Sequence, residues 1–156
     1  MQRIRVAWLL GAVGFLDAAY LTYVHVLSPA HPGGLVGCTA ASGCGAVLAS
    51  RYARVAGIPT SAFGIAFYFA VMAAAARSEE APDGIAPWLL RGLAAAGALV
   101  SAVLLGVQIF SIRALCPYCA LSALASFALL AVMASGQFEL KERTSDPARV
   151  ESPSSS

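Results

Sequence analysis

The stretch "CPYCALSALASFALLAVMAS" at residues 116–135 decides the fold class of this chain. It runs for twenty residues without a charged side chain, about the length that an α-helix needs to cross the hydrocarbon core of a bilayer. Three earlier stretches, at residues 6–27, 60–76 and 87–112, are also long and apolar, with at most one charged residue each. We therefore expect four transmembrane helices.

The composition supports a membrane protein over an ordinary soluble domain. Of the 156 residues, 59% are hydrophobic and only 12% are charged, whereas about a quarter of the residues of a soluble domain are charged. The fold class that we predict is an all-α integral membrane protein, a bundle of four transmembrane helices. Residues 1–138 would form this membrane domain, and the polar, Ser- and Pro-rich residues 139–156 a disordered cytoplasmic tail. Basic residues precede the first apolar stretch, as in a cleaved signal peptide, but the stretch continues past any plausible cleavage site, so we favour an uncleaved helix.

The distribution of cations predicts the orientation in the membrane. An N-terminus in the cytoplasm leaves only three of the ten Lys and Arg residues outside, namely Arg51, Arg54 and Arg113. Because cytoplasmic segments of membrane proteins are enriched in Lys and Arg, we expect both termini to lie on the cytoplasmic side of the cell (inner) membrane. Residues 28–59 then form a long extracytoplasmic loop. Within it, residues 46–55 have apolar side chains on one helical face, so we expect a short amphipathic helix at the membrane surface.

All four cysteines are predicted to lie at one face of the membrane. Cys38 and Cys44 are in the long loop, and Cys116 and Cys119 follow two spans later. An even number of spans returns the chain to the same side, and the extracytoplasmic side permits disulfides. Cys116 precedes Pro117 at a predicted helix start, where the backbone N–H groups and the helix dipole stabilise a thiolate. Two such couples on one face can exchange disulfides.

An outward-facing disulfide relay needs an electron acceptor. The sequence has no flavin or haem motif, so we predict a lipid quinone in a cleft between helices close to Cys119. Gln108, near the outer end of the third span, is a candidate contact of that quinone. Asp17, near the middle of the first span, either has a function or bonds a neighbouring helix. His25 either handles protons or anchors the helix at the interface.

Other interpretations of the cysteines remain open. The first pair could form a permanent structural disulfide, and the second pair could be buried cysteines without a redox role. The four thiols could instead bind zinc, although we predict no metal. A membrane reductase that exports electrons and a non-catalytic scaffold are the alternative functions. Nothing in the sequence indicates a nucleic-acid partner.

Four stretches together resemble the vitamin K epoxide reductase family, in its bacterial disulfide-forming branch. They are "YLTYVH" at residues 20–25, "GC…SGCGAVLASRYARVAGIP" at 37–59, "FGIAFY" at 63–68 and "LCPYCALS" at 115–122. The resemblance implies a four-helix bundle around a quinone and a thioredoxin-like partner that is oxidised at the outer surface.

The resemblance also assigns roles to individual residues. Cys44 would exchange with the partner, Cys38 would pass electrons to Cys116, and Cys119 would face the quinone. Ser50 matches a serine near the quinone headgroup.

Two positions depart from the vertebrate members. Thr60 and Ala123 stand where those enzymes have an Asn and a Tyr implicated in holding vitamin K. We therefore expect Thr60 to contact a respiratory quinone, ubiquinone or menaquinone, rather than vitamin K epoxide. Many family members carry a fused thioredoxin-like domain that this chain lacks, so we expect a separate extracytoplasmic partner.

Overall fold

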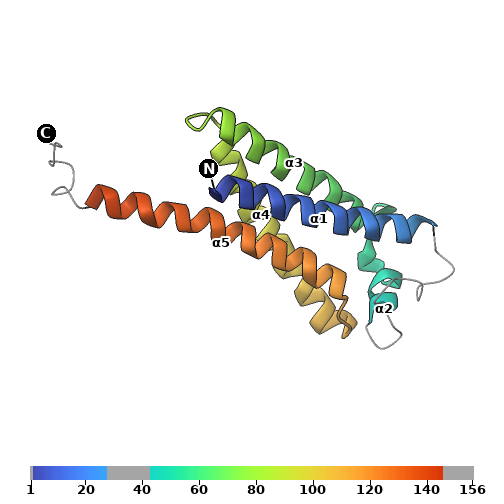
Figure 1. Ribbon diagram of the computed structural model, residues 1–156. Helices are drawn as coiled ribbons and strands as arrows, with labels where there is room; N and C mark the ends of the chain where they lie inside the picture. Colours follow the sequence, from blue (N-terminus) through green and yellow to red (C-terminus); the bar gives the residue numbers. More distant parts are fainter. Residues whose placement is uncertain (1, 28–42, 146–156) are drawn as a thin grey trace, which may run out of the picture.

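Four long helices form the body of the protein in the computed structural model, which describes residues 2–27 and 43–145 (Figure 1). The helices are α1 (Gln2–Leu27), α3 (Thr60–Glu80), α4 (Ala86–Gly106), which continues as the π-helical segment η3 (Val107–Ile112), and α5 (Pro117–Ser145). Each is long and apolar enough to cross a membrane, with candidate spans at Gln2–Val26, Thr60–Glu80, Ala86–Ile112 and Pro117–Ser135. The predicted all-α membrane bundle is confirmed.

A small cap of short elements covers one end of the bundle. It consists of α2 (Cys44–Ala49), the 3₁₀ turn η2 (Arg51–Ala53), and a hairpin of β1 (Arg54–Val55) and β2 (Ile58–Pro59). The single surface helix expected over residues 46–55 is therefore wrong in extent. The helix ends because Ser50 is extended, at ψ 153°, and the chain then turns through Ala56 and Gly57, both with positive φ, as a two-residue hairpin requires.

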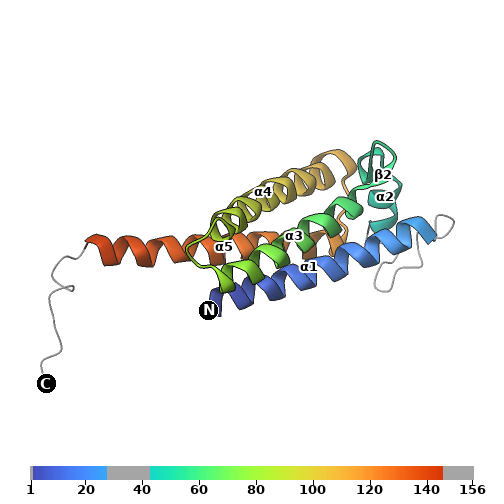
Figure 2. The same cartoon turned by 90° about the horizontal axis from the view of Figure 1, so that it is seen from above.

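The cap and the turn before α5 lie at the same end of the bundle, opposite the N-terminus (Figures 1 and 2). Arg51, Arg54 and Arg113 belong to this end, which we call the cap end. At the opposite end α5 extends past the other helices as far as Ser145. It thus includes residues 139–145 of the segment that we expected to be a disordered tail, while residues 146–156 lie outside the described part of the chain.

The helices pack as a ring in which α1 contacts α3 and α5, and α4 contacts the same two helices from the other side. At the end near the N-terminus the centre of this ring is filled by small and branched apolar side chains, among them Ala7, Val71, Leu90, Ala94 and Leu129. Many large apolar side chains face outward, such as Leu16, Phe69 and Leu99, as expected of a surface in contact with lipid tails. The cap-end half of the described bundle, in contrast, contains a cavity.

Tyr68 of α3 ties three helices together next to that hollow half. Its hydroxyl donates to the backbone oxygen of Ser122 on α5 at 2.7 Å and lies 3.0 Å from the Oγ of Ser126. Its ring packs on Gly14 of α1, where a Cβ would stand only 2.3 Å from the Tyr68 Cε1. Since the hydroxyl is held by α5, the ring has little freedom to move away from α1.

Replacing Gly14 with alanine is therefore expected to destabilise the bundle by about 1–3 kcal/mol, the usual cost of overpacking a core. The measurement is the temperature at which the detergent-solubilised protein loses its folded, monodisperse state. Gly92→Ala on α4 is the matched control, because nothing lies within 4 Å of a Cβ at that position and alanine favours the helix. Equal melting temperatures for the two variants would contradict this account of the Tyr68 contact.

Candidate functional site

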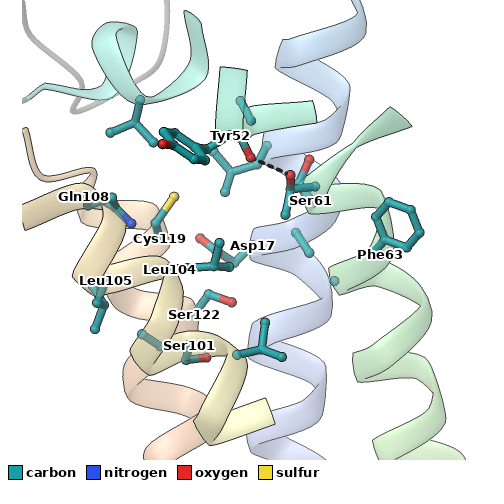
Figure 3. Close-up of a pocket in the computed structure, with 18 of the residues that line it drawn as sticks. Asp17, Tyr52, Ser61, Phe63, Ser101, Leu104, Leu105, Gln108, Cys119 and Ser122 are labelled. Atoms are coloured by element: carbon teal, nitrogen blue, oxygen red, sulfur yellow. Dashed lines mark hydrogen bonds between the residues drawn. The ribbon is translucent and has the colours of Figure 1, made fainter. Parts of the chain in front are cut away.

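A cavity of about 350 Å³ lies between the four long helices at the cap end, beneath α2 and η2 (Figure 3). Its wall is mostly apolar, with side chains such as Leu21, Phe63, Phe67 and Leu104. A smaller number of polar side chains interrupt this wall. They are Asp17, His25, Ser50, Tyr52, Thr60, Ser61, Tyr68, Ser101, Gln108, Cys119, Ser122 and Ser126.

All four residues that the sequence proposed as quinone contacts lie on this wall. Ser50 comes from the end of α2, Thr60 from the first residue of α3, Gln108 from η3 and Cys119 from α5. Their sequence separation reaches 69 residues, from Ser50 to Cys119. The fold thus gathers the four positions around one space, whereas their roles stay predictions.

The inner cysteine pair stands where α5 begins. Cys116 directly precedes Pro117, the first residue of the helix, and its backbone oxygen accepts a bond from the N–H of Ala120 at 2.9 Å. This is the predicted N-cap position. Cys116 and Cys119 are both free thiols. Cys116 is fully buried, while Cys119, one turn further along α5, reaches the cavity wall.

Cys44 lies in the same buried cluster as Cys116. Both side chains are fully buried, and they share the cluster with Leu21 and Val24 of α1 and Val47 of α2. Cys44 is disulfide-bonded, whereas Cys38 falls outside the described residues. The structure thus places Cys44 and Cys116 in one buried cluster and Cys119 on the cavity wall, with Cys44 in a disulfide and Cys116 and Cys119 as free thiols.

Gly43 brings Cys44 close to the inner pair. Its φ is +67°, in the left-handed region that favours glycine. A Cβ at this position would stand 2.8 Å from the Cβ of Ala114 and 3.1 Å from the backbone nitrogen of Leu115. The start of α2 therefore rests directly on the turn that leads into Cys116, and only glycine permits this approach.

The surroundings of Cys116 favour its thiolate. A hydrogen bond from the Cys119 thiol, and then the backbone N–H groups of Cys119 and Tyr118, lower the pKa of Cys116 from 9.0 to about 7. Burial acts in the opposite direction, as a charge on Asp17 would, but both effects are outweighed. Since the thiolate is the nucleophile in disulfide exchange, Cys116 is suited to attack or accept a disulfide near neutral pH.

The pH dependence of the thiolate tests this environment. Because its pKa is lowered, the Cys116 thiolate should form as the pH rises through about 7, well below the range in which an ordinary thiol ionises. The ultraviolet absorbance of the thiolate follows this titration in protein whose inner pair is reduced. In Cys119→Ala the main stabilising hydrogen bond is absent, so the midpoint should move upward. An unchanged midpoint in that variant would contradict the assignment.

Gln108 connects the cysteine pair to the cavity. It is 4% exposed, and its Oε1 accepts a bond from the backbone N–H of Cys116 at 2.9 Å. It lies on η3, a π-helical segment, and such segments are frequent at functional sites. Because the oxygen of the amide is turned to Cys116, the Nε2 group remains as a donor beside the cavity (Figure 3).

The hydroxyl groups of Ser50 and Thr60 are already used as donors. Ser50 donates to the backbone oxygen of Val47 at 2.7 Å, and Thr60 donates to that of Tyr52 at 3.0 Å. These bonds fix the end of α2 and join η2 to the start of α3. Toward a ligand in the cavity, both side chains can therefore offer only acceptor lone pairs.

His25 and Asp17, the two polar candidates on α1, have different hydrogen-bond surroundings. His25 is at the cavity wall, and its Nε2 accepts a bond from the Nε of Arg54 at 2.9 Å, so it joins α1 to the hairpin. Asp17 is 6% exposed, and neither of its carboxyl oxygens has a hydrogen-bond partner among the described residues. The suggestion that Asp17 bonds a neighbouring helix is therefore wrong.

The sequence analysis did not identify two serines of α5, Ser122 and Ser126, that form a polar stripe with Cys119. Ser122 and Ser126 line the cavity on the same face as Cys119. Their spacing of three and four residues places them one and two turns along the helix from Cys119, so the helical period alone could have found them. Tyr68 lay in a stretch that carried the family resemblance, but only the structure shows that it bonds this stripe.

A comparison with known families matches most of the chain. The model of the "Vitamin K epoxide reductase family" matches residues 5–134. The matched part includes all four cysteines, the cap and every residue of the cavity wall.

Proposed function

Because the chain belongs to the vitamin K epoxide reductase family, we propose that it forms disulfides in an extracytoplasmic partner and passes the electrons to a membrane quinone. The family and the four spans make it a multi-pass membrane oxidoreductase. The observation that carries the finer proposal is the burial of Cys44 and Cys116 in one cluster, against which Cys119 packs from the cavity wall.

The proposed relay consists of thiol-disulfide exchanges followed by oxidation of the inner pair. A dithiol of the partner reduces the disulfide of the outer couple, Cys38 and Cys44. A thiolate of that couple then attacks the sulfur of Cys116 in the disulfide of Cys116 and Cys119, forming a mixed disulfide and releasing the Cys119 thiolate, which takes up a proton. The second sulfur of the outer couple attacks this mixed disulfide, which restores the outer disulfide and releases Cys116 as a thiolate. Burial of Cys44 and Cys116 in one cluster supports this exchange, and the low pKa of Cys116 makes it a good leaving group in the second attack.

The residues of the cavity fit a quinone. A volume of about 350 Å³ falls within the range of small-molecule pockets, about 300–1,000 Å³, and the apolar wall suits the ring and the start of its lipid tail. Gln108 would donate a hydrogen bond to a carbonyl oxygen through its Nε2 group, while Ser50 and Thr60 would shape the cap side. Reduction of a quinone to its hydroquinone takes up two electrons and two protons.

The cysteines supply those electrons. When Cys116 and Cys119 close their disulfide they give up one electron pair and two protons, which balances the reduction. Cys119 is the member of the pair on the cavity wall, so it would be the sulfur next to the acceptor. Cys116 would be the other sulfur of the disulfide, and the N-terminus of α5 would stabilise its thiolate in the reduced state.

We further propose that the cap end faces the outside of the inner membrane. Three cations belong to the described part of the cap end, whereas Arg3, Arg5, Arg77 and Arg91 belong to the opposite end, which supports an orientation with the N-terminus inside. The partner would then be a separate thioredoxin-like protein on the outer side of the membrane.

The function is tested with the purified protein in liposomes that contain ubiquinone or menaquinone. A reduced thioredoxin-like protein added outside should lose its thiols while the quinone absorbance falls in equal molar amount. The partner can be identified with Cys38→Ser, which should accumulate a covalent adduct through Cys44. Loss of partner thiols without loss of quinone would overturn the choice of acceptor, and the absence of both would overturn the proposed function.

A further inference from the structure

We propose that Asp17 is a catalytic acid that donates a proton to the acceptor bound in the cavity. This inference rests on the proposed function and adds a residue whose role the cysteine chemistry leaves open. It starts from the only described side chain whose buried polar atoms have no hydrogen-bond partner, the carboxyl group of Asp17.

The position of Asp17 points to a ligand rather than to a structural role. Its carboxyl group comes from the middle of α1 and is turned into the cavity, near Cys119 and Ser122 of α5 (Figure 3). A buried polar group without a partner destabilises the fold, and an ionised one does so more strongly. The fold gains no interaction in return, so a group that enters the cavity and accepts its hydrogen bond would explain its presence.

The surroundings of Asp17 keep a proton on the carboxyl group. No Lys or Arg side chain lines the cavity, whose described wall offers no cation to pair with a carboxylate. The titratable groups near it are Cys116, Tyr118 and Cys119 on the α5 side, Tyr52 of η2, Tyr68 of α3 and His25 of its own helix. Within a membrane, an unpaired carboxylate is disfavoured, so Asp17 would stay neutral until a proton acceptor arrives.

Protons and electrons balance if Asp17 carries one of the two protons. Asp17 gives its proton to one carbonyl oxygen of the quinone and is recharged by the proton of the Cys119 thiol. The second proton comes from water at the cap end, to which Cys116 releases its own proton as its thiolate forms. The two thiols together lose two electrons and two protons, the quinone gains the same, and Asp17 ends as it began.

The test compares Asp17→Asn with the unchanged protein. The variant keeps the size and polarity of the side chain but cannot donate a carboxylic proton, so quinone reduction should slow by about 100-fold, within the range for a general acid. Quinone binding, measured at equilibrium with oxidised cysteines, should persist. Infrared spectra of the quinone-free protein should show a protonated carboxylic acid that is absent from the variant. Ser78→Ala is the control, because it removes a buried hydroxyl that bonds only within α3, far from the cavity wall.

Each outcome separates the inference from the function on which it rests. If the unchanged protein fails to reduce quinone, the proposed function fails. If it succeeds and Asp17→Asn turns over equally fast, the proton-donor role is overturned. Slow turnover with loss of quinone binding would make Asp17 a binding residue only, and an unchanged carboxylic acid band in the variant would show that Asp17 carries no proton. Both of these results contradict the proposal.

Discussion

Replacing Cys116 with alanine is expected to abolish electron transfer from the partner dithiol to the quinone. Cys116 is the member of the inner pair that shares a buried cluster with Cys44, and Cys119 alone cannot form the disulfide that releases an electron pair. The measurement is quinone absorbance in proteoliposomes after addition of the reduced partner. The expected rate is that of the uncatalysed background, and retained turnover would contradict the relay.

Cys119→Ala provides the matched comparison, because it should be equally inactive for a different reason. This variant keeps Cys116, whose thiolate can still attack the disulfide of the outer couple, so a mixed disulfide between Cys116 and the outer couple should accumulate. Cys116→Ala should show no such cross-link. Non-reducing peptide mapping distinguishes the two variants, and a cross-link to Cys119 in Cys116→Ala would reverse the order of the two sulfurs.

The fold of this chain follows from its sequence because a membrane allows few alternatives. Backbone groups in lipid must bond within their own segment, so four apolar stretches of sufficient length predict four helices. The same count of spans predicts that the long loop and residues 113–115 share one end, and the described part of that loop, residues 43–59, lies at the same end as residues 113–115. Hydropathy also predicts the beginnings and ends of the spans to within a few residues, since charged side chains are excluded from the hydrocarbon core.

The cap was harder to predict, because apolar periodicity in a short segment does not decide between a helix and other structures. Residues 46–55 have the period of a helix, but the local hydrogen bond of Ser50 to Val47 and the turn at Gly57 end the helix after one and a half turns. As a result, the residues expected on one apolar face of this helix do not share one environment. Val47 is buried against the bundle, whereas Val55 is 53% exposed in the hairpin.

The cavity could not be predicted without the three-dimensional structure, although two residues of its wall, Cys119 and Gln108, could be named from the sequence. Cys119 and Gln108 could be named from their place near the outer ends of two spans. The missing partner of Asp17 could not, because a sequence gives the burial of a residue only roughly and says nothing of which groups face it. The bond from Cys116 to Gln108 depends in the same way on η3, whose π-helical geometry no residue pattern in this chain predicts.

Gly43→Ala is expected to slow the exchange between the two cysteine couples by about tenfold or more while leaving the inner couple competent. A left-handed conformation costs an alanine about 1–2 kcal/mol, and its Cβ would stand 2.8 Å from the Cβ of Ala114. Relief of that contact moves α2, and with it the outer couple, away from the turn before Cys116, so exchange between the two couples slows. A tenfold slowing corresponds to about 1.4 kcal/mol, so the displacement of α2 has to raise the barrier to exchange by only that amount.

The half-reactions show whether the contact acts on this step. A small dithiol reagent that reduces the inner pair directly should drive quinone reduction in Gly43→Ala at the rate of the unchanged protein, whereas the protein partner should not. Gly57→Ala is the control, because Gly57 also has a positive φ, of 84°, but nothing lies within 4 Å of a Cβ there. Its substitution brings similar backbone strain without moving α2. If both variants slow the partner-driven reaction equally, strain in the cap is responsible and the close approach of Gly43 to Ala114 is not.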